Sequence, residues 1–358
     1  MRHSLSLGAR GLGRVWPNPA VGCVIVKDGR VIGRGRTADG GRPHAETVAL
    51  QQAGGHANGA TVYVTLEPCA HQGETPPCAD ALIEAGVSRV VIATGDPDPR
   101  VAGKGIAILQ AAGIAVETDC LGEAARQQQT GFLTRVTKSR PMVTLKLAST
   151  LDGRIATASG ESQWITGPQA RRRVHAMRAN HDAILVGAGT VRADDPSLNV
   201  RDLGISHYPV RVVASRHLRL PQDSKLFHTA SDQPVWIVCD ESSVETPEAQ
   251  SWQKAGARLI PARPANGQIS ASEMLTELGK TGITRIFCEG GGMLAASLLM
   301  ADLVDQLIVF GAGKVIGAEG QPSVGPLGVS ELSTVPSFEL QDCSTVGNDV
   351  LQIWSRTG

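Results

Sequence analysis

The first part of this chain is organised around a segment that reads PHAETVALQQ at residues 43–52, EPC at residues 67–69 and PPC at residues 76–78. The segment contains one imidazole, His44, and two thiols, Cys69 and Cys78. Zinc prefers nitrogen and sulfur ligands, and three protein ligands leave a fourth position open, which is typical of a catalytic zinc site. The pattern therefore predicts that these three residues bind one zinc ion.

Glu46 stands two residues after His44, within reach of a water in the open position. Zinc lowers the pKa of such a water to about 7, so we expect Glu46 to take the proton and return it to a leaving amine. The zinc-dependent base deaminases have this His-x-Glu and Pro-Cys arrangement. Glu46 also falls near the start of a predicted helix, whose positive dipole end favours a deprotonated carboxylate.

Two other interpretations remain open at this point. Eight residues separate Cys69 from Cys78, whereas deaminases usually have two between their cysteines. The cysteines could simply be buried beside an unrelated histidine. The zinc could also be structural, with a fourth ligand nearby; His71 and His56 are the candidates.

The composition excludes several classes of function. The 358 residues suffice for two domains. Lys+Arg and Asp+Glu both total 34, so no overall charge attracts nucleic acid or an acidic membrane surface. Aromatic residues make up 3%, which is few for a surface that stacks on bases.

The seven cysteines are scattered and odd in number, so they do not indicate a disulfide framework. With a predicted thiolate–zinc site, they indicate a reducing compartment. No apolar stretch has the length of a membrane helix. The N-terminal run has apolar residues at helical spacing, which favours a core helix over a targeting peptide. We therefore expect a cytoplasmic protein.

Strands that alternate with helices predict an α/β fold in both halves, with sites at the carboxyl ends of the strands. In the first half we expect a strand hairpin over 21–26 and 31–32 and two further strands over 61–66 and 89–93. We also expect four helices, over 1–12, 43–53, 78–85 and 106–113. We predict a first domain over 1–120 and a second domain over 141–358. The linker between them, 121–140, is predicted to begin with a polar helix.

The second half reads as a mixed sheet that ends in two antiparallel strands. We expect strands over 143–147, 183–186, 210–214, 235–239, 258–260, 285–288, 307–310, 338–340 and 350–354, with helices over 169–180, 271–280 and 293–301. Two glycine-rich turns, 187–190 and 289–292, follow strands. Such turns offer free N–H groups to a phosphate, although neither has the spaced glycines of the dinucleotide fingerprint. A tight turn without a ligand is an equal alternative for each.

The first half resembles a known family in PNPAVGCVIV at residues 17–26, PHAE at 43–46, and YVTLEPC through TPPC at 63–78. These motifs are similar to those of the bifunctional riboflavin-biosynthesis deaminase–reductases, in which the eight-residue gap between the cysteines is usual. The resemblance implies a cytidine-deaminase-like, three-layer α/β domain that removes the 2-amino group of a phosphoribosylamino-diaminopyrimidinone. It assigns zinc to His44, Cys69 and Cys78, the proton transfer to Glu46, and substrate contacts to Asn18 and His71. Glu74 departs from the family, which often has a basic residue there for the substrate phosphate.

The second half resembles the reductase half of the same family, in KLA at 146–148, LDGR at 151–154, GESQWIT at 160–166, VRADDP at 191–196 and EGG at 289–291. That half is similar in fold to dihydrofolate reductase and uses NADPH to reduce the ribosyl arm to ribityl. The residues matched to NADPH contacts are Ala148, Trp164, Thr190, Asp194, Ser215, Gly291, Gly292, Met293, Leu294, Ala295, Ala296 and Ser297. Those matched to substrate contacts are Lys146, Ser162, Arg178, Leu198, Arg201 and Glu289.

Among these, Arg178 and Arg201 suit a phosphate, because a guanidinium can form two parallel hydrogen bonds to it; surface ion pairing is the alternative. Lys146 and Glu289 are the candidates for the proton donor of the reduction. The expected partners are a small-molecule substrate and further copies of this chain, without nucleic acid or membrane. The competing function is a nucleoside or tRNA deaminase whose C-terminal part is a non-catalytic, nucleotide-sensing module.

Overall fold

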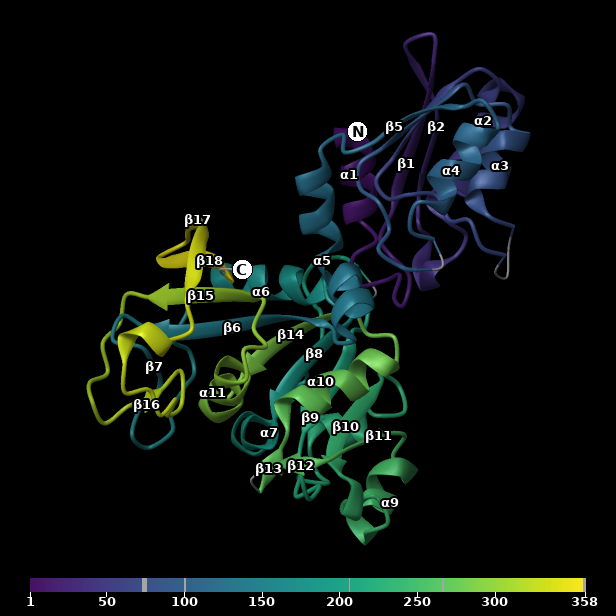
Figure 1. Cartoon of the computed structure of the whole chain (residues 1–358). Helices are drawn as coiled ribbons and strands as arrows, with labels where there is room; N and C mark the ends of the chain where they lie inside the picture. The colour runs from purple at the N-terminus through teal and green to yellow at the C-terminus, as the bar shows by residue number, and fades with distance from the viewer. Residues whose placement is uncertain (73–75, 100, 206, 266, 357–358) are drawn as a thin grey trace. The chain divides into compact units, whose positions relative to one another are not determined.

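The computed structural model describes residues 1–72, 76–99, 101–205, 207–265 and 267–356, and the chain forms two compact units, Met1–Arg140 and Pro141–Gly358 (Figure 1). The predicted linker, 121–140, consists mostly of helix α5 (Gly122–Lys138). This helix belongs to the first unit because its buried face packs there: Phe132 contacts the core, and Gln129 donates a 2.8 Å hydrogen bond to the carbonyl of Ala20.

The first unit contains a five-stranded sheet in the order β2-β1-β3-β4-β5. Its first three strands are antiparallel and the last pairs are parallel. The strands are β1 (Gly22–Lys27), β2 (Arg30–Arg36), β3 (Thr61–Val64), β4 (Arg89–Ile92) and β5 (Ala115–Glu117). The other helices are α1 (Arg2–Ala9), α2 (Ala45–Ala53), α3 (Cys78–Glu84) and α4 (Lys104–Ala111).

The core of the first unit lies where helices cover the apolar strands of this sheet. The central strand β1 is almost fully buried, as its run of apolar residues predicts. Ile25 and Val62 have no exposed surface and belong to the same cluster as Ala49 of α2 and Leu82 of α3. The two helices that carry the predicted metal ligands are therefore fixed to the sheet by core packing.

The second unit contains a nine-stranded sheet in the order β11-β10-β9-β8-β14-β6-β15-β18-β17 (Figure 1). The strands from β11 to β15 run parallel, and β18 and β17 continue the sheet antiparallel. Their bounds are β6 (Met142–Thr150), β8 (Ala183–Gly187), β9 (Val210–Ala214), β10 (Val235–Asp240), β11 (Arg258–Ala262), β14 (Arg285–Gly290), β15 (Gln306–Ala312), β17 (Phe338–Val346) and β18 (Asp349–Arg356). Two small ladders pair β16 (Gln321–Pro322) with β7 (Arg154–Ala156) and β12 (Pro264–Ala265) with β13 (Gln268–Ile269).

The helices of the second unit are α6 (Pro168–Ala179), α7 (Ala188–Asp194), α8 (Lys225–His228), α9 (Pro247–Lys254), α10 (Ala271–Lys280) and α11 (Gly292–Met300). Helix α10 shows how local sequence sets such an element. The Ser270 hydroxyl caps it by accepting from the N–H of Glu273, and Met274, Leu275 and Leu278 form its buried stripe. The bounds predicted for this helix, 271–280, agree with the structure.

Candidate active sites

Three elements of the first unit bring the predicted zinc ligands together. His44 is the N-cap of α2, Cys69 follows β3, and Cys78 is the first residue of α3. Nδ1 of His44 lies 3.6 Å from Sγ of Cys69 and 3.4 Å from Sγ of Cys78. The backbone N–H of Cys78 also donates to Sγ of Cys69 at 3.3 Å. One nitrogen and two sulfur donors, from segments far apart in sequence, therefore lie together.

The donor distances fit a zinc ion. Zinc binds sulfur at about 2.3 Å and imidazole nitrogen at about 2.0–2.1 Å in tetrahedral geometry, which places a nitrogen and a sulfur ligand about 3.5 Å apart. The three donor atoms all lie within 4.8 Å of one another. In the described part of the chain, neither His56 nor His71 joins this group, so the arrangement is that of a three-ligand site.

The electrostatics of this cluster differ from the prediction made from the helix dipole. Glu46 is 4% exposed, and burial first, then the charge of Cys69, raises its pKa to about 7. Burial thus opposes the helix dipole at this carboxyl group. A carboxyl group with a pKa near neutrality can both accept and return a proton.

A hydrogen bond couples the two thiols. The hydrogen bond from Cys78 lowers the pKa of Cys69 to about 4, and the same bond is the largest cause of the raised pKa of Cys78. Zinc binds cysteine as thiolate, so metal binding would release the remaining thiol proton. The donor set thus fits a divalent cation in chemistry as well as in distance.

The two predicted substrate contacts of this unit are tied to the segments that carry the metal ligands, Asn18 through a hydrogen bond and His71 by its position two residues after Cys69. Asn18 donates through Nδ2 to the carbonyl of Gly41 at 2.8 Å, which fixes it to the loop that precedes His44. Nδ1 of His71 is buried and has no hydrogen-bond partner among the described residues. An unpaired buried nitrogen suits a ring that contacts a ligand. Glu74, the predicted departure from the family, lies outside the described residues.

In the second unit the predicted residues gather along one edge of the parallel sheet. Lys146 and Ala148 lie on β6, Glu289 lies near the end of β14, and Thr190 and Ser215 follow β8 and β9. These strands are neighbours in the sheet and run parallel. Their carboxyl ends therefore meet at the edge where ligands bind in open α/β sheets.

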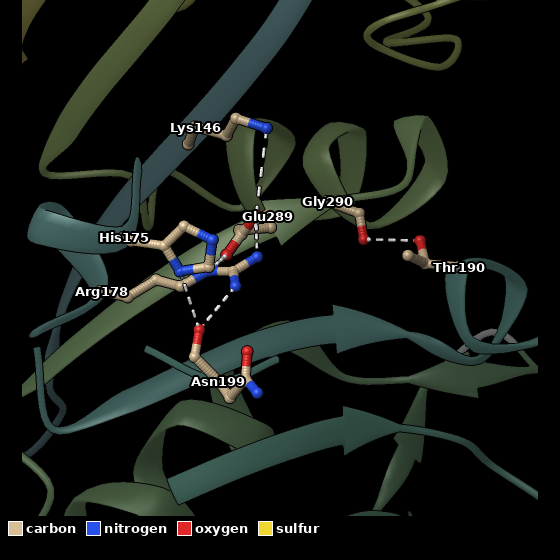
Figure 2. A network of polar contacts seen from close by, with 7 residues as sticks. All are labelled: Lys146, His175, Arg178, Thr190, Asn199, Glu289 and Gly290. Carbon is tan, nitrogen blue, oxygen red and sulfur yellow. Dashed lines mark hydrogen bonds and ion pairs between the residues drawn. The ribbon is translucent and has the colours of Figure 1, made fainter. Parts of the chain in front are cut away.

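Three charged side chains form the centre of this site (Figure 2). The Arg178 guanidinium donates from Nε to Oε1 of Glu289 at 2.5 Å and from Nη2 to Oε2 at 3.0 Å. Nζ of Lys146 lies 4.0 Å from Oε2. Burial raises the pKa of Glu289, but the charges of Arg178 and Lys146 outweigh burial and leave it below its usual range. The carboxylate is therefore ionised and paired.

The two arginines predicted to suit a phosphate, Arg178 and Arg201, differ in their contacts. Besides its two bonds to Glu289, Arg178 donates from Nη1 to the carbonyl of Asn199 at 2.8 Å. Arg201 has a half-exposed side chain whose contact is Asp202 at 3.7 Å. Arg178 is thus part of the internal network, whereas Arg201 is the more available of the two to an anionic group.

The predicted NADPH contacts follow two adjacent strands that each lead into a helix. Gly290 and Gly291 have positive φ and form the turn before α11, whose first residues are the matched segment 291–297. Thr190 of α7 donates through Oγ1 to the carbonyl of Gly290 at 3.2 Å (Figure 2). A turn of this kind leaves N–H groups free for a phosphate, so the residues fit a dinucleotide.

The remaining matched residues differ in burial and in their contacts. Ser162 donates to Asp194 at 3.5 Å, and Ser215, 4% exposed, continues β9. Leu198 is buried with a positive φ of 47°. Trp164 is 56% exposed and has the Arg171 guanidinium 4.5 Å from its ring centre.

Two residues of the candidate reductase site, His175 and Asn199, are not among those matched from the sequence. His175 and Arg178 are one turn apart on α6, and Nδ1 of His175 lies 3.1 Å from the same Asn199 carbonyl that Arg178 contacts (Figure 2). Because that carbonyl accepts, the ring nitrogen must donate. Burial first, then the charges of Arg178 and Arg201, lowers the pKa of His175. The sequence signal for His175 is its i, i+3 spacing from Arg178, which places both side chains on one face of a helix. The contact of these residues with Asn199 cannot be read from local sequence.

The fold and the two sites define a class of protein: a zinc-type deaminase unit followed by an α/β reductase unit. Family models agree with both halves. Residues 1–94 match the cytidine and deoxycytidylate deaminase zinc-binding region, and residues 141–352 match the RibD C-terminal domain. The predicted fold class is thereby confirmed, with an NADPH-dependent type of reductase in the second half and zinc in the first.

Curated relatives resemble the chain over its full length. The riboflavin biosynthesis protein RibD of Haemophilus influenzae is 43% identical, covering 100% of this chain and 97% of its own. That of Escherichia coli is 44% identical, covering 98% and 96%. A solved RibD structure from Acinetobacter baumannii has a TM-score of 0.89 at 39% identity, covering 100% of this chain and 98% of its own. The chain belongs to the RibD family of riboflavin biosynthesis proteins.

It is accordingly a bifunctional enzyme, a deaminase and a reductase of riboflavin biosynthesis that acts on a small molecule. The competing function, a nucleoside or tRNA deaminase with a non-catalytic C-terminal module, receives no support from these matches. In the part of the chain that the structure describes, every helix is too short or too polar to cross a membrane.

Proposed function

We propose that the enzyme deaminates 2,5-diamino-6-(5-phosphoribosylamino)pyrimidin-4-one and then reduces the ribosyl arm, giving 5-amino-6-(5-phosphoribitylamino)uracil. A structure from Thermotoga maritima titled diaminohydroxyphosphoribosylaminopyrimidine deaminase/5-amino-6-(5-phosphoribosylamino)uracil reductase supports this, with 36% identity, a TM-score of 0.87 and coverage of 100% of this chain and 97% of its own. The observation that carries the proposal is the His44, Cys69 and Cys78 donor set beside the buried Glu46.

In the first unit, His44, Cys69 and Cys78 would hold zinc, and Glu46 would move the proton. Zinc supplies, when bound, the Lewis acidity that lowers the pKa of water. Glu46 takes a proton from the attacking water and gives it to the amino group, so that water is consumed and ammonia leaves. Asn18, anchored through Gly41, and the unpaired Nδ1 of His71 would orient the pyrimidine.

In the second unit, NADPH supplies hydride when bound, and the chain must supply a proton. Of the two candidates, Glu289 is ionised and its two oxygens accept from Arg178, so it has no proton to give. Burial lowers the pKa of Lys146, which makes its ammonium a stronger acid. We therefore assign the proton to Lys146, the positioning of the substrate to Glu289 and Arg178, and the phosphate contact to Arg201.

The same proposal assigns deamination to residues 1–140 and reduction to residues 141–358, in a cytoplasmic homo-oligomer. Strand β17 is the terminal strand of the nine-stranded sheet, and its side chains are exposed along most of its length. An exposed edge strand of this kind is a ready site for pairing with another chain. Light scattering coupled to gel filtration measures the mass, and a monomer at micromolar concentration would contradict this part.

A coupled assay tests the activity. The purified chain with zinc, NADPH and the diaminopyrimidine should release one ammonia and oxidise one NADPH per substrate. Cys69→Ala should release no ammonia, yet it should oxidise NADPH at the normal rate when the deaminated intermediate is supplied. Cytidine and tRNA serve as alternative substrates, and deamination of either at a comparable rate would refute the proposed specificity.

A further inference from the structure

Glu67 is a buried acidic residue two positions before Cys69, and its side chain is 4% exposed. Both carboxylate oxygens are fully engaged by backbone N–H groups. Oε2 accepts from Asp96 at 3.3 Å and Gly103 at 3.1 Å, and Oε1 accepts from Gly105 at 3.1 Å and Ile106 at 3.3 Å. One side chain thus joins the segment that carries Cys69 to the loop after β4 and to the first turn of α4.

A buried carboxylate is costly unless hydrogen bonds replace its water. Four donors achieve this here, and two of them belong to the N-terminal turn of α4, whose dipole favours a negative charge. The backbone of Glu67 is held as well, because its N–H donates to the carbonyl of Thr94 at 3.0 Å. The residue is therefore fixed in position through both its backbone and its side chain.

The same turn of α4 rests directly on the peptide that precedes Cys69. A Cβ atom added to Gly105 would lie 2.0 Å from the carbonyl oxygen of Pro68, so only glycine permits this approach. Gly105 thus both donates a hydrogen bond to Glu67 and packs against Pro68. This contact transmits the position of α4 to the backbone that leads into the thiol.

We propose that Glu67 is a positioning residue that, together with Gly105, holds Cys69 in the geometry that zinc binding requires. The inference rests on the proposed role of Cys69 as a zinc ligand. A residue that merely capped α4 would contribute stability without affecting the metal. A residue that positions the thiolate must also affect zinc affinity and the ligand field of the bound metal. Groups that orient metal ligands typically change affinity by about 10- to 100-fold when replaced.

The decisive variant is Glu67→Gln in the full chain. Glutamine has the same shape, but its NH2 group must face two N–H donors whichever way the amide is turned, since each oxygen accepts from two. We expect the zinc dissociation constant, measured by competition with a chelating dye, to rise about 10- to 100-fold. The visible absorption of the cobalt-substituted chain should shift, because the thiolate geometry changes. Oxidation of NADPH with the deaminated intermediate should remain at the wild-type rate.

Asp182→Asn is the matched control, because Asp182 is a buried carboxylate of the second unit that accepts from the N–H and hydroxyl of Thr284 and the N–H of Arg285. It should lower the unfolding midpoint without changing zinc affinity or the cobalt spectrum. If Glu67→Gln does not yield soluble protein, Glu67→Asp, whose shorter side chain cannot reach all four donors, takes its place. Zinc affinity and a cobalt spectrum within twofold of wild type in the soluble variant would overturn the inference.

A further arm separates this inference from the proposed zinc site. Cys69→Ala should lose zinc affinity far more than Glu67→Gln does. Should Cys69→Ala bind zinc as tightly as the wild-type chain, then Cys69 is not a ligand, and the proposed site and this inference fail together. Loss of affinity in Cys69→Ala with none in Glu67→Gln would refute the positioning role alone.

Discussion

The deaminase and reductase sites differ in how their charged groups are balanced. In the first unit, Nδ1 of His44 lies 3.4–3.6 Å from the sulfurs of Cys69 and Cys78, and a hydrogen bond couples the two thiols. In the second unit, Lys146 and Arg178 face Glu289 as opposite charges (Figure 2). The first site is therefore complete only with a metal, whereas the polar network of the second is formed by the chain itself.

The largest expected effect separates the two chemistries. Glu46→Gln keeps the shape of the side chain but removes its ability to take a proton. Deamination should fall about a thousandfold, since positioned acid–base groups contribute about 10²- to 10⁴-fold. Ammonia release measures this, and bound zinc, measured by atomic absorption, should stay near that of the wild-type chain. NADPH oxidation with the deaminated intermediate should not change; its loss would mean that the sites are not independent.

The second prediction concerns the preformed network. Arg178→Met leaves Glu289 without its main partner, and these side chains are only 14% and 11% exposed. Removing one partner of a buried pair costs about 3–5 kcal/mol, and replacing both by apolar residues restores much of it. Urea unfolding should therefore show a loss of about 3 kcal/mol in Arg178→Met and a smaller loss in the double variant Arg178→Met/Glu289→Met.

Arg263→Met is the control for that measurement, because Arg263 pairs with Glu241 at 3.6 Å while its side chain is 77% exposed. An exposed pair contributes about 0–1 kcal/mol. Equal losses in Arg178→Met and Arg263→Met would contradict the view that the reductase network is formed and stabilising before ligand binds.

The same contrast explains what the sequence could predict. The clustering of His44, Cys69 and Cys78 is predictable because residue types and spacing are local, and the Ser270 cap and apolar period likewise predict α10. Helix α7 was read as a glycine-rich turn, since glycine disfavours helix. It forms because Val191 packs into the core at 1% exposure. Helix α5, which covers most of the predicted linker, docks through Gln129 on Ala20, a contact between residues distant in sequence that no local pattern indicates.

Electrostatic states were equally hard to predict. The dipole of α2 is a local property, and it suggested an ionised Glu46. The raised pKa follows from burial, which depends on tertiary packing. The hydrogen bonds from Arg178 to Glu289 and to the carbonyl of Asn199 likewise join segments that are far apart in sequence.

The third prediction tests whether the interior of the second unit avoids uncompensated charge. His181 is 5% exposed, donates from Nδ1 to Met177 at 2.7 Å and accepts at Nε2 from Thr144 at 2.9 Å. Burial lowers its pKa from 6.5 to about 3. Below pH 6.5 the unfolded chain therefore binds a proton that the folded chain excludes, so stability falls as pH falls. The loss at pH 5 should be about 2 kcal/mol.

Urea unfolding at pH 7 and pH 5 measures this loss. Four of the five tryptophans belong to the second unit, and Trp252 there is fully buried, so emission reports mainly on that unit. In His181→Asn, the free energy of unfolding should depend less on pH, because one fewer proton is taken up on unfolding. If the free energy of unfolding of this variant fell between pH 7 and pH 5 as much as that of the wild-type chain, groups other than His181 would cause the loss.

The smallest expected effect concerns Trp164, an exposed residue that the family resemblance matches to NADPH. The Arg171 guanidinium lies 4.5 Å from the ring centre of Trp164 and donates to the carbonyl of Thr166 at 2.7 Å, so it restrains an otherwise exposed ring. A cation–π contact at such a site contributes about 0.5–1 kcal/mol. If Trp164 contacts NADPH as the family resemblance implies, Arg171→Ala should raise the dissociation constant for NADPH about two- to fivefold by calorimetry.

The control is a second contact of the same kind elsewhere in this unit. Arg258 lies 4.9 Å from the ring centre of Trp236, which is only 8% exposed and is not among the proposed cofactor contacts. Arg258→Ala should leave the affinity for NADPH unchanged. Arg171→Lys keeps a cation over the ring and should lose less affinity than Arg171→Ala. Equal affinities in all three variants would show that Trp164 needs no restraint, and that the preformed part of this site ends at the buried Arg178–Glu289 network.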